Sequence, residues 1–189
     1  MNETRDDTRR STAELGFPDR PGQDPIGRVL MAASQAMAIG GGLIFTALVA
    51  MSIVSIVGRK IAAAPVPGDV ELLQMGAAVA ASTFFAHCHM AQRNIRVDFF
   101  TAWLPAAWSD GLDAAGSLLL AVVGALIAAR TWAGAATLRE FGETSAVLAI
   151  PAWIAQILMV PGFLLMAAAG LYMAVWHGRR IVAGVPGRR

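Results

Sequence analysis

The sequence predicts an all-α integral membrane protein with four transmembrane helices. Of its 189 residues, 56% are hydrophobic and only 15% are charged, and the mean hydropathy is +0.57. This composition is too apolar for a soluble domain of this length. The apolar residues also gather into four long segments, about 29–57, 70–90, 112–137 and 151–176. Each is as long as or longer than the roughly 20 residues that a helix needs to cross a bilayer.

The fourth segment carries the clearest signal for a membrane span. From Ala146 to Trp176 no side chain is charged, and Trp153 lies near one end while Tyr172 and Trp176 lie near the other. Aromatic rings at both ends are typical of helices that meet the two headgroup regions. We expect this helix to begin at Pro151, because a proline in the first position gives up only an N–H that would have no helical partner.

The first segment contains a regular stripe of small residues. Ala32, Ala36 and Gly40 recur every four residues, and such a stripe lets another helix approach closely. Two interpretations are open at this point. The stripe packs against the chain's own helices, or it forms an interface with a second subunit.

An amphipathic segment separates the second and third spans and is predicted to lie in the membrane interface. Its apolar residues recur at helical spacing opposite Asp98 and Thr101, which indicates a helix lying on the membrane instead of crossing it. Pro105 divides the segment in two. The residues assigned to this interfacial segment are Arg96, Asp98, Phe100, Trp103 and Trp108.

The two ends of the chain are polar, and their charge predicts the orientation. Residues 1–28 are predicted to be a disordered tail and residues 177–189 a basic tail. These tails and the loop after the second span together hold eleven of the 15 lysines and arginines, whereas the loops on the opposite side hold only Arg59, Lys60 and Arg139. Basic residues favour the cytoplasmic side, so both termini are predicted to be cytoplasmic.

Two charged residues lie at or within the predicted spans. Arg130 falls inside the third span, and Glu71 begins the second span on the same outer side. A charge inside a membrane is a functional candidate by default. We expect an intramembrane pair between Glu71 and Arg130 that ties the bundle together. The alternative is that Arg130 reaches the outer headgroups on its long side chain.

Several function classes lack support in the sequence. A net charge of +2 and the absence of a basic run with interleaved aromatic residues argue against nucleic-acid binding. No nucleophile has a base at a catalytic spacing, which argues against an enzyme. No carboxylate lies deep in a span, as a transport pathway of its own would require. We therefore interpret the chain as a subunit of a larger membrane assembly.

Two runs of sequence carry a resemblance to a known family. The run AQRNIRVDFFTAWLP between the second and third spans and the run GETSAVLAIPAWIAQILMVPGFLL at the fourth span resemble the small membrane subunit of tripartite ATP-independent periplasmic (TRAP) transporters. The likeness covers about Gly27 to Trp176 and includes PGDVELLQ at the start of the second span. Asn94 departs from the family pattern, in which many members carry histidine.

The resemblance implies a three-part transporter of the bacterial inner membrane. A soluble periplasmic protein captures an organic acid and delivers it to a large transmembrane subunit, which uses a sodium gradient. The small subunit braces the large one within the membrane lipids, receives the periplasmic protein and needs no cofactor itself. The candidates for steering that protein are the charged residues predicted on the periplasmic side, which are Arg59, Lys60, Arg139, Glu140 and Glu143.

Two other functions stay open on the sequence. The first is a four-helix haem b anchor of a redox enzyme, with His87 or His89 and His177 as axial ligands. Residues two apart on a helix diverge by about 200°, so solvated interface histidines are the simpler interpretation. The second is a small exporter that works as a dimer, although the chain lacks a buried carboxylate for proton coupling.

Overall fold

The computed structural model describes residues 24–63, 66–91 and 106–182 and contains four helices. They are α2 (Pro25–Ala62), α3 (Asp69–Met90), α4 (Ala106–Phe141) and α5 (Ala152–Val182). The described residues form no sheet; an isolated bridge joins Thr144 and Pro151. The all-α prediction is therefore confirmed.

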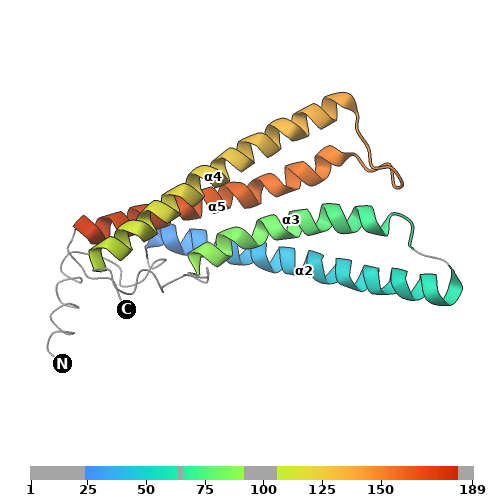
Figure 1. Cartoon of the computed structure of the whole chain (residues 1–189), viewed down its shortest axis with the longest axis horizontal. Coiled ribbons are helices and arrows are strands. Elements are labelled where there is room, and N and C mark those ends of the chain that lie inside the picture. The colour runs from blue at the N-terminus through green and yellow to red at the C-terminus, as the bar shows by residue number, and fades with distance from the viewer. Residues whose placement is uncertain (1–23, 64–65, 92–105, 183–189) are drawn as a thin grey trace.

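The helices form two antiparallel hairpins, α2 with α3 and α4 with α5 (Figure 1). The hairpins meet mainly through α3 and α5, and among the described residues α4 packs against α5 alone. The start of α2 and the end of α5 lie at one end of the bundle, which we call the terminal end (Figure 1). The α2–α3 turn and the α4–α5 loop lie at the other, which we call the loop end, and the hairpins diverge toward it.

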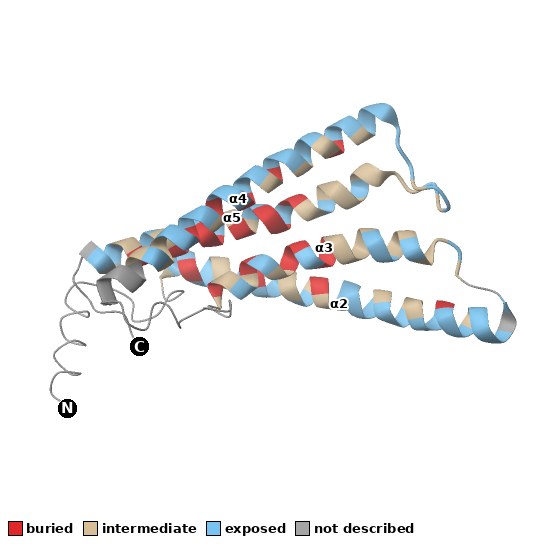
Figure 2. Cartoon of the chain, viewed as in Figure 1, coloured by how far each residue is buried: buried red, intermediate tan, exposed pale blue. Residues whose placement is uncertain are grey.

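The buried residues concentrate in the middle of the bundle and toward the terminal end (Figure 2). One cluster contains Ala86 of α3, Ala128 of α4 and Phe163 of α5, and a second contains Met90 and Met173. Large apolar side chains on the outer faces of the helices remain exposed. This distribution is expected for a membrane bundle, because lipid is as apolar as leucine and covers the outer faces.

Glycines of α5 allow it to pack closely against both α3 and α4. A Cβ on Gly162 of α5 would lie 2.6 Å from the Ser82 carbonyl oxygen of α3. A Cβ on Gly170 of α5 would lie 2.8 Å from the Ser117 carbonyl oxygen of α4. No side chain fits at either position without moving the neighbouring backbone, so glycine allows these helices to touch.

Three of the four helices are long and apolar enough to cross a membrane. Within the described residues, these candidate spans are Pro25–Ile61, Gly111–Phe141 and Ala152–Arg179. Polar residues such as Gln74, Ser82 and Thr83 lower the apolar character of α3. At about 1.5 Å per residue its 22 residues still extend roughly 33 Å, the thickness of a bilayer core. Its crossing remains a prediction.

The helices extend beyond the boundaries expected from the sequence. The first begins at Pro25, inside the predicted tail of residues 1–28, and α5 continues through His177 to Val182, into the predicted basic tail. The reason is that polar residues outside a membrane can continue a helix whose apolar part lies inside it. Residues 1–23 and 183–189 lie outside the described part of the chain.

The predicted interfacial segment is mostly outside the described residues. This applies to Arg96, Asp98, Phe100 and Trp103. Trp108 lies in the first turn of α4, which begins directly after Pro105. A proline before a helix is consistent with its poor fit inside one.

Candidate docking surface at the loop end

The charged residues that the sequence predicted for docking all lie at the loop end. Arg59 and Lys60 lie in the last turn of α2, and Arg139 and Glu140 lie in the last turn of α4. Glu143 lies in the α4–α5 loop, and all five residues are exposed. They occupy two separate tips of the bundle, one at the end of each hairpin.

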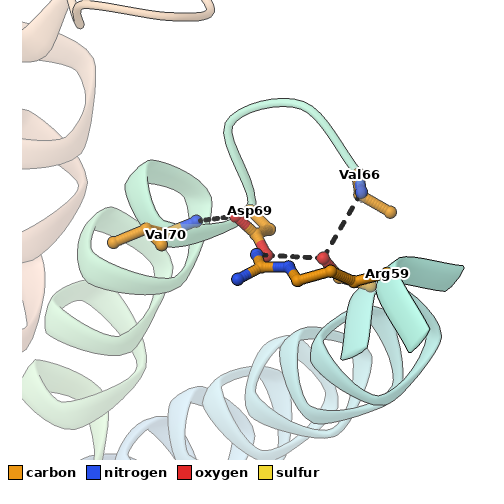
Figure 3. Close-up of polar contacts among 5 residues, drawn as sticks. Arg59, Val66, Asp69 and Val70 are labelled. Atoms are coloured by element: carbon orange, nitrogen blue, oxygen red, sulfur yellow. Dashed lines mark hydrogen bonds and ion pairs between the residues drawn. The ribbon is translucent and has the colours of Figure 1, made fainter. Parts of the chain in front are cut away.

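A polar cluster closes the α2–α3 turn (Figure 3). The buried Ser55 hydroxyl donates to Asp69 Oδ2 at 2.5 Å and accepts the N–H of Val66 at 3.3 Å. Arg59 Nη2 lies 3.5 Å from the same carboxylate oxygen. The Asp69 Oδ1 atom accepts the N–H of Val70 at 2.8 Å. These contacts join the end of α2 to the start of α3.

Asp69, a residue type that often caps helices, does not occupy the cap position of α3. The cap residue of α3 is Gly68, whose φ of 72° places it in the left-handed region, and Asp69 is the first helical residue. The hydrogen bond from Ser55 holds the pKa of the Asp69 carboxyl below its usual range, and the N–H of Val70 and the charge of Arg59 act in the same direction. Asp69 is therefore ionised at neutral pH and fixed to α2.

The α4–α5 loop is closed by its own backbone. The Ser145 N–H donates to the Ile150 carbonyl at 2.9 Å, and the Ala152 N–H donates to the Glu143 carbonyl at 3.0 Å. The Ser145 hydroxyl accepts the N–H of Ile150 at 3.3 Å. The loop is thus a narrow, hydrogen-bonded turn with a defined shape.

The side chain of Glu71 fastens this loop to the other hairpin. Its Oε1 atom accepts the N–H of Val147 at 2.8 Å, and its Oε2 atom accepts the N–H of Leu148 at 3.2 Å. The Leu148 side chain lies directly against Gly68, where a Cβ would overlap it. We call the contacts of Glu71 with Val147 and Leu148, together with the contact of Leu148 with Gly68, the latch.

The structure does not bring Glu71 and Arg130 together. The Glu71 carboxylate is occupied by the loop N–H groups, and Arg130 is an exposed residue of α4, a helix that does not pack against α3. An ion pair instead joins Arg59 to Asp69 at the α2–α3 turn. The expected pair fails because α5 lies between the helices that carry the two charges.

The two arginines at the loop end contact other side chains. The Arg139 guanidinium lies 5.5 Å from the centre of the Trp153 ring, and Arg59 is paired with Asp69. Within the described part of the chain, the side chains of Lys60, Glu140 and Glu143 have no such contact. Arg59 and Arg139 are exposed as well, so the α2–α3 tip presents two cations, one of them paired with Asp69, and the α4–α5 tip presents two glutamates beside Arg139.

The small-residue stripe lies on an open face of α2. Ala32 and Ala36 are exposed, and a Cβ on Gly40 would meet nothing within 4 Å. The neighbouring Gly41 instead packs closely on Thr83 of α3. The chain's own helices therefore leave the face of Ala32, Ala36 and Gly40 uncovered.

The three histidines differ in exposure, since His87 and His89 are half-buried and His177 is buried. His177 is only 3% exposed, and its ring lies against that of Trp176 with the centroids 4.9 Å apart at an interplanar angle of 83°. His177 lies in α5, which continues past Trp176 to Val182. The described residues contain no group of three or more potential metal ligands.

Sequence reasoning missed the polar cluster of the α2–α3 turn and the true partners of Glu71. A signal for the first was present, since Ser55 is a polar residue close to the outer end of an apolar helix. The second depends on how the α4–α5 loop folds back, which local patterns do not reveal.

Comparison with known proteins identifies the family of the chain. Neither the curated proteins nor the solved structures include a match to it. Residues 48–180 match the family model described as "Tripartite ATP-independent periplasmic transporters, DctQ component". This region is more than half of the chain and contains the last part of α2 together with α3, α4 and nearly all of α5. The chain therefore belongs to the DctQ component family, the non-catalytic small membrane subunits of TRAP transporters.

Proposed function

We propose that this chain is the scaffold subunit of a sodium-coupled TRAP transporter that imports an organic acid. In this function it braces the large transmembrane subunit in the bacterial inner membrane and helps to receive the periplasmic binding protein. Family membership supports a transporter subunit with these two kinds of partner. It also displaces the haem b anchor and the autonomous exporter, which belong to other classes of membrane protein.

The observation that carries the bracing function is the uncovered face of α2. Several glycines of the bundle pack against its own helices, as at Gly41, Gly162 and Gly170. Gly40 instead has open space in front of it, as its neighbour Gly42 does, and it continues the line of the exposed Ala32 and Ala36. Since helices in lipid associate through close packing, this face suits a helix of the large subunit.

The loop end supports the docking function. If the termini are cytoplasmic, the α2–α3 turn and the α4–α5 loop both face the periplasm, because they lie at the opposite end of the bundle (Figure 1). Lys60 on one tip and Glu140 and Glu143 on the other are exposed. Exposed charges of this kind accelerate the encounter of a soluble partner whose charges are complementary.

Reconstituted transport tests both functions. The chain is purified with its large subunit, placed in proteoliposomes and supplied with loaded binding protein at low and at high ionic strength. We expect Lys60→Glu, or Glu140→Lys with Glu143→Lys, to slow uptake at low salt and to approach the unmodified complex at high salt, because salt screens exposed charges over about 10 Å at 0.1 M. Arg28→Glu at the terminal end is the control. Equal rates for all variants at low salt would remove the loop-end charges from docking.

A further inference from the structure

We infer that Glu71 is a positioning residue that holds the α4–α5 loop in the form that the periplasmic binding protein recognises. This inference rests on the proposed docking function and adds the part of the surface that makes contact. The recognised surface is the exposed crown of the loop, which consists of Thr144, Ala146, Val147 and Ala149.

The latch links the two hairpins at the loop end. The described residues of α3 and α4 do not pack against each other, and the hairpins diverge here (Figure 1). Glu71 nevertheless reaches across from α3 to the N–H groups of Val147 and Leu148. The partly buried Leu148 adds an apolar contact with Gly68. Without the latch, the backbone bonds inside the loop would still set its shape, but the loop would lose the contacts with Glu71 and Gly68 that fix its place relative to the start of α3.

A carboxylate suits this task better than any other side chain of its size. Each of its oxygens accepts one of two neighbouring N–H groups, and a charged acceptor makes stronger hydrogen bonds than a neutral one. A glutamine has one acceptor oxygen and one donor nitrogen, so its amide nitrogen would face an N–H. The Glu71→Gln change therefore removes one hydrogen bond and leaves two donors facing each other.

The latched loop displays an apolar side chain beside acidic ones. Val147 is 63% exposed although its own N–H is bound by Glu71. Ala149 has a φ of 52°, which a residue with a Cβ rarely adopts and which the flanking hydrogen bonds of Ser145 and Ile150 hold in place. Glu140 and Glu143 flank this crown. The matching partner is the binding protein, with a small apolar spot rimmed by basic side chains.

Transport kinetics separate positioning from general structure. Initial uptake by the reconstituted complex is measured against the concentration of loaded binding protein. We expect Glu71→Gln to raise the KM for the binding protein about fivefold to tenfold with a maximal rate within about twofold of the original, because only a fraction of loops would be in the competent form. Glu71→Asp keeps two acceptors and is expected to recover part of the loss. Gln74→Ala, an exposed change one turn along α3, is the matched control.

Amide hydrogen exchange tests the latch directly. In Glu71→Gln the N–H groups of Val147 and Leu148 are expected to exchange faster, while that of Ala152, bonded to Glu143, keeps its protection. Leu148→Ala keeps the carboxylate but removes the apolar contact, and it is expected to raise the KM by several-fold as well. Should Glu71→Gln fail to assemble, Leu148→Ala decides the question.

Three results would overturn the inference. The first is unchanged exchange at Val147 and Leu148, the second is faster exchange without a change in KM, and the third is an equal loss in Glu71→Asp and Glu71→Gln. If Lys60→Glu still slows uptake at low salt in any of these cases, the proposed docking function stands and only the role of Glu71 fails. If the charge variants also have no effect, docking at the loop end fails as a whole.

Discussion

Gly41 of α2 lies directly against Thr83 of α3, so that a Cβ on Gly41 would overlap the threonine hydroxyl and stand 3.1 Å from the Ala80 carbonyl oxygen. Its neighbour Gly40 faces open space. The two adjacent glycines therefore have different tasks. Gly41 joins the α2–α3 hairpin, and Gly40 is available to a partner.

Comparing Gly41→Leu with Gly40→Leu distinguishes packing within the α2–α3 hairpin from contact with the large subunit. We expect Gly41→Leu to lower the stability of the isolated subunit by about 1–3 kcal/mol, because overpacking forces the helices apart. Gly40→Leu should leave the isolated subunit stable but abolish co-purification with the large subunit. The measurements are thermal unfolding in detergent and pull-down of the complex. Intact co-purification with Gly40→Leu would move the subunit interface away from this face of α2.

Changes at Glu71 and Arg130 are expected to act independently. The carboxylate of Glu71 is bound by loop N–H groups and Arg130 lies on the exposed face of α4. The effects of Glu71→Gln and Arg130→Ala on unfolding free energy should therefore add to within about 0.5 kcal/mol in the double variant. Recovery of more than about 1 kcal/mol in the double variant would show that the two side chains interact after all.

The polar cluster of the α2–α3 turn predicts a dependence of stability on pH. Because the hydrogen bond from Ser55 lowers the pKa of Asp69 in the folded protein, the contribution of Asp69 is fully present above its unfolded pKa of about 3.9. It is lost as the pH falls through the lower folded value. Asp69→Asn should thus reduce the Tm at pH 7, and the difference from the unmodified chain should shrink below about pH 4.

Glu140→Gln provides the control for this measurement, since Glu140 is exposed and takes no part in the cluster. Its Tm is expected to follow that of the unmodified chain from pH 7 downward. A difference between Asp69→Asn and the unmodified chain that stays constant down to pH 2 would separate Asp69 from the acid response.

The arrangement of the hairpins sharpens the prediction of topology. A reporter fused after Arg189 should be active only if it is of the cytoplasmic type, because basic residues gather at the terminal end. Reporters inserted near Pro65 and near Thr144 should both be active only in the periplasmic type, since both connections lie at the loop end (Figure 1). Opposite behaviour of the two insertions would show that α3 does not cross the membrane.

The sequence by itself determined the class of the protein, the number of helices and the approximate position of each. The physical reason is that membrane spanning depends on local composition: a helix satisfies its own backbone, and a run of about 20 apolar residues suffices to place it in lipid. The break after Pro105 and the start of the last helix beside Pro151 follow from the same local rules, because proline acts on its own neighbours. The short motifs around Asp98 and Gly142 likewise pointed to the family that residues 48–180 match.

Only the tertiary structure decided which groups meet. Glu71 and Arg130 lie at similar depths in the predicted bundle, but α5 separates their helices and the α4–α5 loop takes the carboxylate. Gly40 and Gly41 are identical residues in adjacent positions, and their separation into an open and a closed face depends on where α3 packs. Such contacts depend on the angle and rotation of each helix, which lipid does not set and only the packing of the neighbouring helices does.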